Sequence, residues 1–245
     1  MSKPLLLKLL CLACFVYTQN TSIRAQTNTG EVIVQFQNVA NNRPIALRDS
    51  FYTNSFNETY QVTKLKYYIS NIQLTGSRNV EPIANVFLVD AEIKDGLRFA
   101  IPPGTYNKLS FTLGLDSALN NRGAQDGLLD PLKGMFWTWN SGYVYFKLEG
   151  FSPSSTADLQ RIEHHIGGYK GVNKAARQIE LPLPASLIVG PKGSRTITVQ
   201  MNLDSYWKGR SDITIASNAL IMAPGPLAVK SADNFEGLFS IIDVK

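Results

Sequence analysis

The stretch GLRFAIPPGTYNKLSFTLGLD, Gly96–Asp116, decides the fold class of this chain, because it contains two strand-like runs with a turn between them. In the second run apolar and polar residues alternate, so that Leu109, Phe111 and Leu113 lie on one face of an extended backbone. The Pro-Pro-Gly sequence between the two runs is typical of turns. We therefore predict two β-strands joined by this turn.

Similar runs occur on both sides of this stretch. The run EVIVQFQNV places Val32, Val34 and Phe36 on one face by the same alternation. No window sustains the period of a helix over three turns, and only SADNFEGLFSI, at 231–241, suggests one short helix. The other strand-like runs lie at 64–76, 85–92, 177–184, 195–203 and 212–222. This series predicts an all-β protein, an antiparallel β-sandwich of about 8–10 strands with little helix.

The segment DSALNNRGAQDGLLDPLKG, at 116–134, lacks strand character and is rich in Asp, Asn and Gly. Such a segment predicts one long functional loop. Its hard oxygen ligands would suit calcium, but these residues more often serve turns, so we do not expect calcium there. The candidate oxygen ligands for calcium are Asp116, Asn120, Asp126 and Asp130.

No internal repeat and no Gly/Ser linker divides the chain after the leader, so 26–245 should form a single domain.

Residues 1–25 have the pattern of a secretory signal peptide. A basic start and an apolar run interrupted by Lys8 precede a polar stretch, and cleavage is expected after Ala25. The apolar run is too short to span a bilayer, which takes about 20 residues. Lipidation at Cys14 is the less favoured alternative, because Cys11 stands where a branched apolar residue is expected. We predict a periplasmic or secreted protein with no transmembrane segment in the mature chain.

Removal of this leader changes the charge and the cysteine content. The leader carries three basic residues and no acid, so the formal net charge falls from +5 to +2. A nearly neutral chain gives no argument for a nucleic-acid partner. Both cysteines leave with the leader, so the mature protein should contain no disulfide. Motifs of hydrolases, such as Gly-x-Ser-x-Gly or His-Glu-x-x-His, do not occur in the sequence.

Six aromatic residues crowd eleven positions of the stretch GMFWTWNSGYVYFKLEG, at 134–150. The Asn-Ser-Gly sequence in its middle is a hairpin signal, with the glycine suited to a left-handed backbone. A three-residue loop at this place would bring four rings to one face of the hairpin. The predicted cross-strand pairs are Trp139 with Tyr143 and Trp137 with Tyr145.

Three explanations of this aromatic face stay open. It could be structural, with the other face in the sandwich core and this one covered by the long loop. It could also be a platform that stacks on sugar rings, or a redox or metal site. We expect the long loop to fold over the hairpin and to screen Trp137 or Trp139 from water. The residues expected on the opposite face are Phe136, Val144, Phe146 and Leu148.

The chain has only two histidines, the neighbours His164 and His165. Neighbouring residues of an extended backbone point to opposite faces, so at most one of them should enter a buried site. Two histidines exclude a zinc site with three histidine ligands. The other soft ligands are the thioethers of Met135, Met201 and Met222, and copper(I) tolerates such a sparse set best among the common metals.

Three stretches of the sequence resemble the MbnP-like family of copper-binding proteins, most closely its Bacteroidota-type members. They are FTLGLDSALNN at 111–121, GAQDGLLDPLKGMFWTWNSGYVYFKLEG at 123–150 and HHIGGYKG at 164–171. The resemblance spans most of the mature chain. It implies a periplasmic or secreted protein of the kind named for a partner of methanobactin systems.

The resemblance also implies chemistry at a tryptophan. In the characterised branch of the family, a dihaem enzyme of the MauG/peroxidase type oxidises a tryptophan to kynurenine. The modified residue lies beside a copper ion that histidines hold. Carried over by motif, the resemblance implies Trp137 or Trp139 as the modified residue and His165 as a copper ligand.

We therefore expect an exported metal-handling protein that binds copper, is not itself an enzyme, and has a dihaem peroxidase as partner. The expected metal site brings His165 to one of the two tryptophans, with His164 or Met135 as a further ligand. Tyr143 and Tyr145 complete the aromatic face. The alternative is a secreted or surface β-sandwich module that binds carbohydrate or another ligand on that face.

Overall fold

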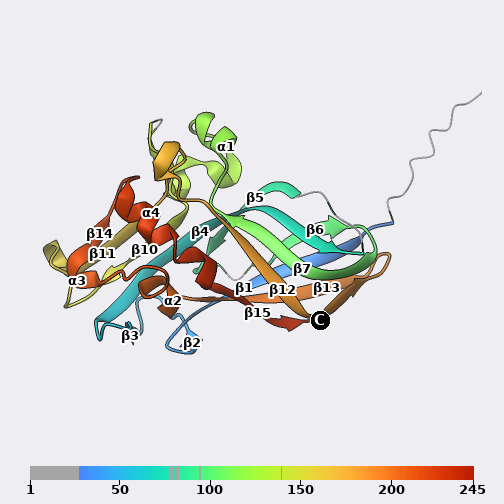
Figure 1. Ribbon diagram of the computed structural model, residues 1–245, viewed down its shortest axis with the longest axis horizontal. Helices are drawn as coiled ribbons and strands as arrows, with labels where there is room; N and C mark the ends of the chain where they lie inside the picture. The colour runs from blue at the N-terminus through green and yellow to red at the C-terminus, as the bar shows by residue number, and fades with distance from the viewer. Residues whose placement is uncertain (1–27, 78–79, 81–82, 94, 139) are drawn as a thin grey trace, which may run out of the picture.

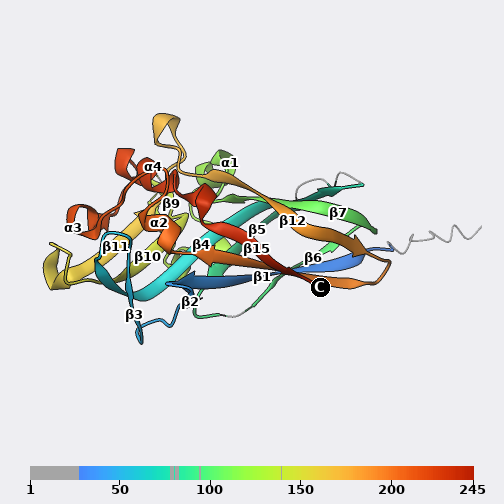
Figure 2. The same ribbon diagram turned by 60° about the horizontal axis from the view of Figure 1, so that its bottom comes forward.

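Two β-sheets pack face to face in an elongated sandwich, and the short helices gather at one end of it (Figure 1 and Figure 2). The computed structural model describes residues 28–245, with the exception of 78–79, 81–82, 94 and 139. Strands hold 50% of the described residues and helices 17%, which confirms the expected all-β sandwich with little helix. The predicted leader, 1–25, and Cys14 lie outside the described residues.

The first sheet is formed by strands from both ends of the chain: β1 (Gly30–Ala40), β2 (Arg43–Pro44), β6 (Leu97–Ile101), β13 (Ser194–Asn202) and β15 (Phe239–Val244). β1 lies in its middle, and the alternating side chains of Val32 and Val34 are almost fully buried. β1 pairs in parallel with β13 and antiparallel with β2 and β6. We predicted an antiparallel sandwich, but the parallel pair of β1 and β13 makes this sheet mixed.

The second sheet has the order β12-β7-β4-β10-β11-β14, with two further strands, β3 and β5, on β4. Its strands are β3 (Phe51–Thr53), β4 (Thr59–Gly76), β5 (Ile83–Asp90), β7 (Gly104–Leu113), β10 (Phe146–Phe151), β11 (Arg161–Ile166), β12 (Arg177–Val189) and β14 (Leu220–Ile221). All of its pairs are antiparallel except β11 with β14. A separate two-stranded ribbon consists of β8 (Phe136–Thr138) and β9 (Gly142–Tyr143).

The helices are short and lie in the connections. No helix of the described residues is long and apolar enough to cross a membrane. The α-helices are α1 (Ser117–Asn121), α2 (Asp204–Trp207), α3 (Ile215–Asn218) and α4 (Pro226–Ala232). The 3-10 helices are η1 (Gly127–Leu129), η2 (Pro131–Lys133), η3 (Asp158–Gln160), η4 (Gly171–Asn173) and η5 (Phe235–Gly237).

The core lies between the two sheets and is rich in aromatic side chains. The stretch Gly96–Asp116 contains β6 and β7, and its alternating residues Leu109, Phe111 and Leu113 are at most 1% exposed. Across the core, Phe111 meets Phe36 of β1 and Phe239 of β15 at ring-centroid distances of 6.0 Å and 5.2 Å. The predicted apolar faces are therefore the faces that hold the sandwich together.

One predicted strand, 212–222, is wrong. Most of this run forms a loop and α3, and only Leu220–Ile221 joins the sheet as β14. The cause is a carboxylate from a distant part of the chain. Glu58, 7% exposed, accepts hydrogen bonds from the backbone N–H groups of Ile215 and Ala216 at 2.7 Å and 2.8 Å. These bonds satisfy donors at the start of a helix that would otherwise have no partner.

The long strand β4 changes its partner midway, and this change positions the candidate site. Along one edge β4 pairs with β10 up to Tyr67 and with β7 from Ile69 onward. Between them, the N–H of Tyr68 donates to the carbonyl of Tyr145, and its carbonyl accepts from the N–H of Gly114, both at 2.9 Å. The chain that connects β7 to β10 therefore leaves the sheet at this break and carries the long loop and the aromatic hairpin.

Candidate functional site

The aromatic hairpin forms, but its strands pair in a different register from the predicted one. β8 and β9 place Phe136 opposite Tyr143, and the register shifts next to this pair, at Trp137. The rings of Phe136 and Tyr143 have centroids 4.8 Å apart. The predicted pair of Trp137 with Tyr145 is therefore wrong. Trp139 itself lies outside the described residues.

Contacts with α1 explain this register. Gly142 has a left-handed backbone with φ 74°, and an added Cβ there would lie only 2.5 Å from Oδ1 of Asn120. The same oxygen accepts the N–H of Tyr143 at 3.1 Å. Only glycine permits this close approach without strain. Asn120, which belongs to another segment, thus fixes the register of the hairpin. The sequence of the turn itself does not indicate this contact.

The segment 116–134 folds over the tyrosines of the hairpin, whereas the predicted screening of Trp137 or Trp139 by this loop stays a prediction, because Trp137 is only half-buried and Trp139 lies outside the described residues. The hydroxyl of Tyr143 donates to the carbonyl of Leu129 at 2.9 Å. The side-chain amide of Asn120 donates to the hydroxyl of Tyr145 at 2.9 Å. Both tyrosines are 0% exposed. This part of the aromatic face is therefore closed by protein and is not open for stacking on a sugar ring.

Two of the three acidic residues of the same segment act as helix caps, whereas Asp126 makes no such side-chain hydrogen bond. Asp116 accepts the N–H of Leu119 at 2.7 Å at the start of α1. Asp130 accepts the N–H of Leu132 at 2.8 Å at the start of η2. Side-chain oxygens at these positions satisfy backbone donors that a short helix leaves open. Capping and turn formation therefore account for the Asp-rich and Asn-rich composition of the segment.

Trp137 is half-buried, and its ring lies on Gly167 of the HHIGG stretch. An added Cβ on Gly167 would lie 2.9 Å from Cζ3 and 3.1 Å from Cη2 of this indole. The indole Nε1 is buried and has no hydrogen-bond partner among the described residues. Such an unpaired donor costs about 1–3 kcal/mol, and in a native structure it needs an explanation. The structure thus brings the tryptophan run and the histidine run together at Trp137 and Gly167.

His164 points into the core and is 0% exposed. Its Nε2 lies 2.6 Å from the carbonyl oxygen of Asn218, and its Nδ1 lies 2.8 Å from the hydroxyl of Tyr206. A carbonyl can only accept, so Nε2 carries the hydrogen and Nδ1 accepts from the tyrosine. Burial lowers the pKa of His164 to about 4. The ring has no free lone pair for a metal, and it ties β11 to α2 and α3.

His165 points to the outer face of the sheet, and its side chain is 12% exposed. The two histidines therefore point to opposite faces, as predicted. The Nε2 of His165 lies 2.9 Å from Oε1 of Glu149 on β10. The hydrogen bond from His165 is the main cause that lowers the pKa of Glu149 to about 2, so the carboxylate is ionised and accepts. The Nδ1 of His165 has no partner among the described residues.

Lys147 links this ion pair to the long loop. It stands opposite His165 on the neighbouring strand, and its ammonium lies 3.5 Å from Glu149. It also donates a hydrogen bond to the carbonyl of Gly134, at the end of the covering segment. Burial lowers the pKa of Lys147, although Glu149 opposes this effect. The outer face around His165 is therefore a polar network that is held in place by the loop.

The three methionines of the described chain differ in access. Met135, predicted to assist a metal, and Met201 are both 0% exposed, whereas Met222 is 47% exposed. Within the part of the chain that the structure describes, no group of three or more His, Cys, Asp or Glu side chains could hold a metal ion. These side chains would suit only a metal ion that accepts few and soft ligands. Among them, His165 is the one histidine with a ring nitrogen that has no partner in the described chain.

Four residues that shape this site were not predicted from the sequence. Glu149 and Lys147 carry a signal, because they are charged residues that alternate with apolar ones in FKLEG on a central strand. Tyr206 and Asn218, the partners of His164, come from segments far along the chain. Nothing in their local sequence indicates that they meet a histidine.

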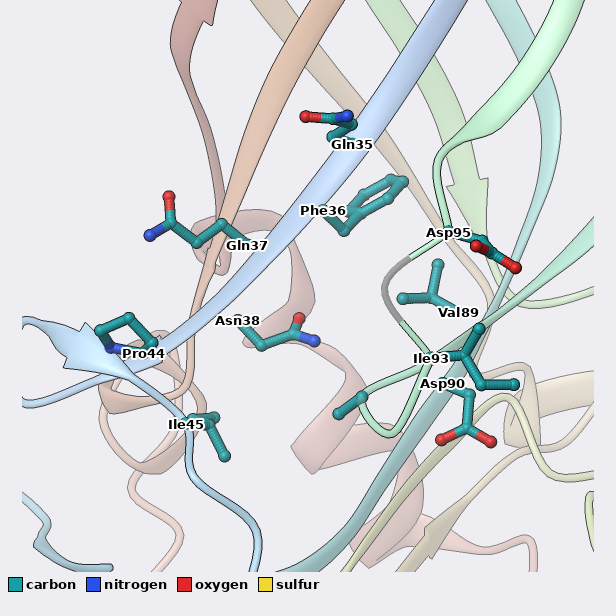
Figure 3. Close-up of a pocket in the computed structure, with 11 residues that line it drawn as sticks. Gln35, Phe36, Gln37, Asn38, Pro44, Ile45, Val89, Asp90, Ile93 and Asp95 are labelled. Atoms are coloured by element: carbon teal, nitrogen blue, oxygen red, sulfur yellow. The ribbon is translucent and has the colours of Figure 1, made fainter.

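A cleft of about 360 Å³ lies elsewhere, between β1 and the connection from β5 to β6 (Figure 3). Asn38 faces it, but its Oδ1 already accepts the hydroxyl of Tyr67 at 2.8 Å. Asp90, at the other wall, forms an ion pair with Lys66 at 2.7 Å. None of the predicted site residues lines this cleft. The candidate site is therefore the outer face around His165 and Trp137.

Comparison with known proteins supports the resemblance found in the sequence. The solved structure of MbnP from Methylosinus trichosporium matches this chain with a TM-score of 0.59 and 16% identity, over 82% of this chain and 87% of the other. At this identity the likeness shows the fold alone. No curated protein matches the sequence. The family model of MbnP matches residues 29–223, most of the chain, and the protein therefore belongs to the MbnP family.

Proposed function

We propose that this is an exported copper-handling protein, not itself an enzyme, which holds copper(I) as cargo at His165. Membership of the MbnP family suggests a copper-related role. The observation that carries the proposal is the hydrogen bond from Nε2 of His165 to Glu149. It makes Nδ1 of this residue the one imidazole nitrogen without a protein partner among the described residues.

The contact with Glu149 is of the kind that supports metal binding. Histidines that bind metals usually donate their other N–H to a carboxylate, which fixes the tautomer and raises the basicity of the ligand. Copper(I) accepts imidazole and thioether ligands and tolerates a small number of them. The ammonium of Lys147 lies 3.5 Å from the same carboxylate and repels a cation. We therefore expect reversible binding, which suits delivery or transfer of copper rather than storage.

The proposal includes oxidation of Trp137 by a dihaem partner of the MauG type with dioxygen or peroxide as the oxidant: the indole C2–C3 bond breaks, both carbons gain oxygen, and hydrolysis releases C2 as formate to leave kynurenine. Two observations support Trp137: its ring lies on Gly167, two residues beyond His165, and its Nε1 is buried without a partner in the described chain. A kynurenine would offer an aryl amine and carbonyl groups where the indole offers only a donor. Export through the N-terminal leader would bring the protein to a compartment where such partners act.

Anaerobic titration with copper(I) against a chromophoric competitor such as bicinchoninate tests the proposal. The parent protein should take copper(I) from the competitor, and His165→Ala should bind at least about tenfold more weakly, because its only open imidazole is lost. His164→Gln is the matched control and should lose much less affinity than His165→Ala, since His164 has no free lone pair and glutamine keeps a donor and an acceptor for its two contacts. Equal affinity of His165→Ala and the parent would refute the proposed site.

A further inference from the structure

The parallel pair of β11 and β14 brings a methionine beside His165. The last pair of this ladder joins His164 to Ile221. The next residue on each chain is His165 on one side and Met222 on the other. Neighbouring strands of a sheet lie about 4.8 Å apart, so these two backbones are in direct contact range.

The chains continue side by side beyond this pair. Four residues after His164 and three after Ile221, an added Cβ on Gly168 would lie 3.3 Å from Cβ of Pro224. Met222 is thus bracketed by two contacts with the histidine stretch, one before it at Ile221 and one after it at Pro224. Between these two contacts the histidine stretch advances by four residues and the other stretch by three, so Met222 lies alongside 165–167.

Exposure places both side chains on the same face. Side chains alternate across a strand, and paired residues of neighbouring strands point to the same side. His164 and Ile221 both point inward, with 0% and 4% exposure. The following pair should therefore point outward, and the side chain of His165 is 12% exposed while Met222 is 47% exposed. We therefore expect the imidazole and the thioether to flank one another on the outer face.

We propose that Met222 is the second soft ligand of the copper(I) site, next to Nδ1 of His165. This inference rests on the proposed function and adds a ligand to it. Copper(I) favours thioether sulfur, and the unbranched methionine side chain can adjust its three torsions to reach a metal. Met135 and Met201 are 0% exposed, so Met222 is the one accessible thioether of the described chain.

The histidine stretch of the proposed site also lies close to Trp137. Its ring lies on Gly167, which follows His165 by two residues, just beyond the end of β11. Met222 runs along this stretch from the other side, between the contacts at Ile221 and Pro224. A copper ion between His165 and Met222 would therefore lie in the neighbourhood of the indole.

The test compares Met222→Leu with the matched control Met135→Leu under the same copper(I) competition. Both changes replace a thioether by a side chain of similar volume, which folded cores and surfaces tolerate well. Residues that only orient a ligand change metal affinity about 10–100-fold, so Met222→Leu should weaken binding at least about tenfold. Met135→Leu should leave the affinity unchanged. X-ray absorption of the copper-loaded parent should show a copper–sulfur distance that Met222→Leu lacks and Met135→Leu retains.

The outcomes separate this inference from the function on which it rests. If copper(I) binding depends on His165 but Met222→Leu keeps both the affinity and the copper–sulfur signal, Met222 is not a ligand and the proposed function stands. If Met135→Leu loses the signal instead, the ligand is the core methionine and the inference is wrong. If the parent takes no copper(I) from the competitor, both proposals fall.

Discussion

Acidification from pH 7.5 to pH 4.5 should destabilise the protein through His164. The folded chain holds this imidazole neutral, because burial lowers its pKa to about 4 from the ordinary value of 6.5. The unfolded chain takes up a proton as the pH falls through 6.5, whereas the folded chain does so only near pH 4. The stability that His164 contributes is therefore complete above pH 6.5 and is lost between pH 6.5 and 4.

The size of the effect follows from the two pKa values. The interval from 6.5 to about 4 corresponds to about 3–4 kcal/mol at about 1.4 kcal/mol per pH unit, and about 2–3 kcal/mol of it should be lost by pH 4.5. The side chain is 0% exposed, so screening by solvent does not reduce this figure. Glu149, whose pKa is lowered to about 2, loses its contribution at lower pH, from about 4.5 downward.

Urea unfolding followed by tryptophan fluorescence at pH 7.5, 6.5, 5.5 and 4.5, with a chelator present, measures this effect. His164→Gln is the control, because glutamine keeps a donor and an acceptor but does not titrate. The variant should be about 1–3 kcal/mol less stable at pH 7.5, since its hydrogen bonds to Tyr206 and Asn218 are imperfect. Its stability should then vary less with pH than that of the parent. The same slope in both proteins would refute the assignment of the pH dependence to His164.

Three further substitutions test contacts of the site and the fold. Glu149→Gln keeps an acceptor for His165 but removes the charge, so copper(I) affinity in the competition assay should fall about 10–100-fold; an unchanged affinity would argue against an orienting role. Gly142→Ala places a Cβ 2.5 Å from Asn120 at φ 74°, so urea unfolding should show a loss of at least about 1 kcal/mol, and an equally stable variant would contradict the required glycine. Glu58→Gln removes the buried charge that accepts two N–H groups at the start of α3, so the free energy of unfolding should fall by about 1–3 kcal/mol, and a thermal melt like that of the parent would count against it.

The predicted strands are correct where alternating apolar residues pack against the opposite sheet. The run 212–222 shows the limit of this signal. Ile213 and Ile215 are both 0% exposed, so the alternation correctly marked two buried residues. The backbone is nevertheless not a strand, because Glu58 accepts the N–H groups that a ladder would have used. A pattern of side chains reports which residues are buried, and the hydrogen-bond partners of the backbone decide the conformation.

The site was predictable to a similar extent. The alternation placed His164 and His165 on opposite faces, but it could not say which face is the core, because both faces of β11 are covered. Inside lie Tyr206 and the segment of Asn218, and outside lies the ion pair with Glu149. The register of the aromatic hairpin failed for the same reason, since the contact that fixes it comes from another segment.

His164 also determines where both proposed ligands lie, although it cannot bind a metal itself. Its Nε2–H donates to the carbonyl of Asn218, the last residue of α3, and β14 begins two residues later. The same hydrogen bond therefore holds β11 and sets the start of the strand that leads to Met222. Because His165 follows His164 directly, a shift of this contact by one residue would turn His165 into the core. The spacing between imidazole and thioether on the outer face thus depends on a neutral histidine inside.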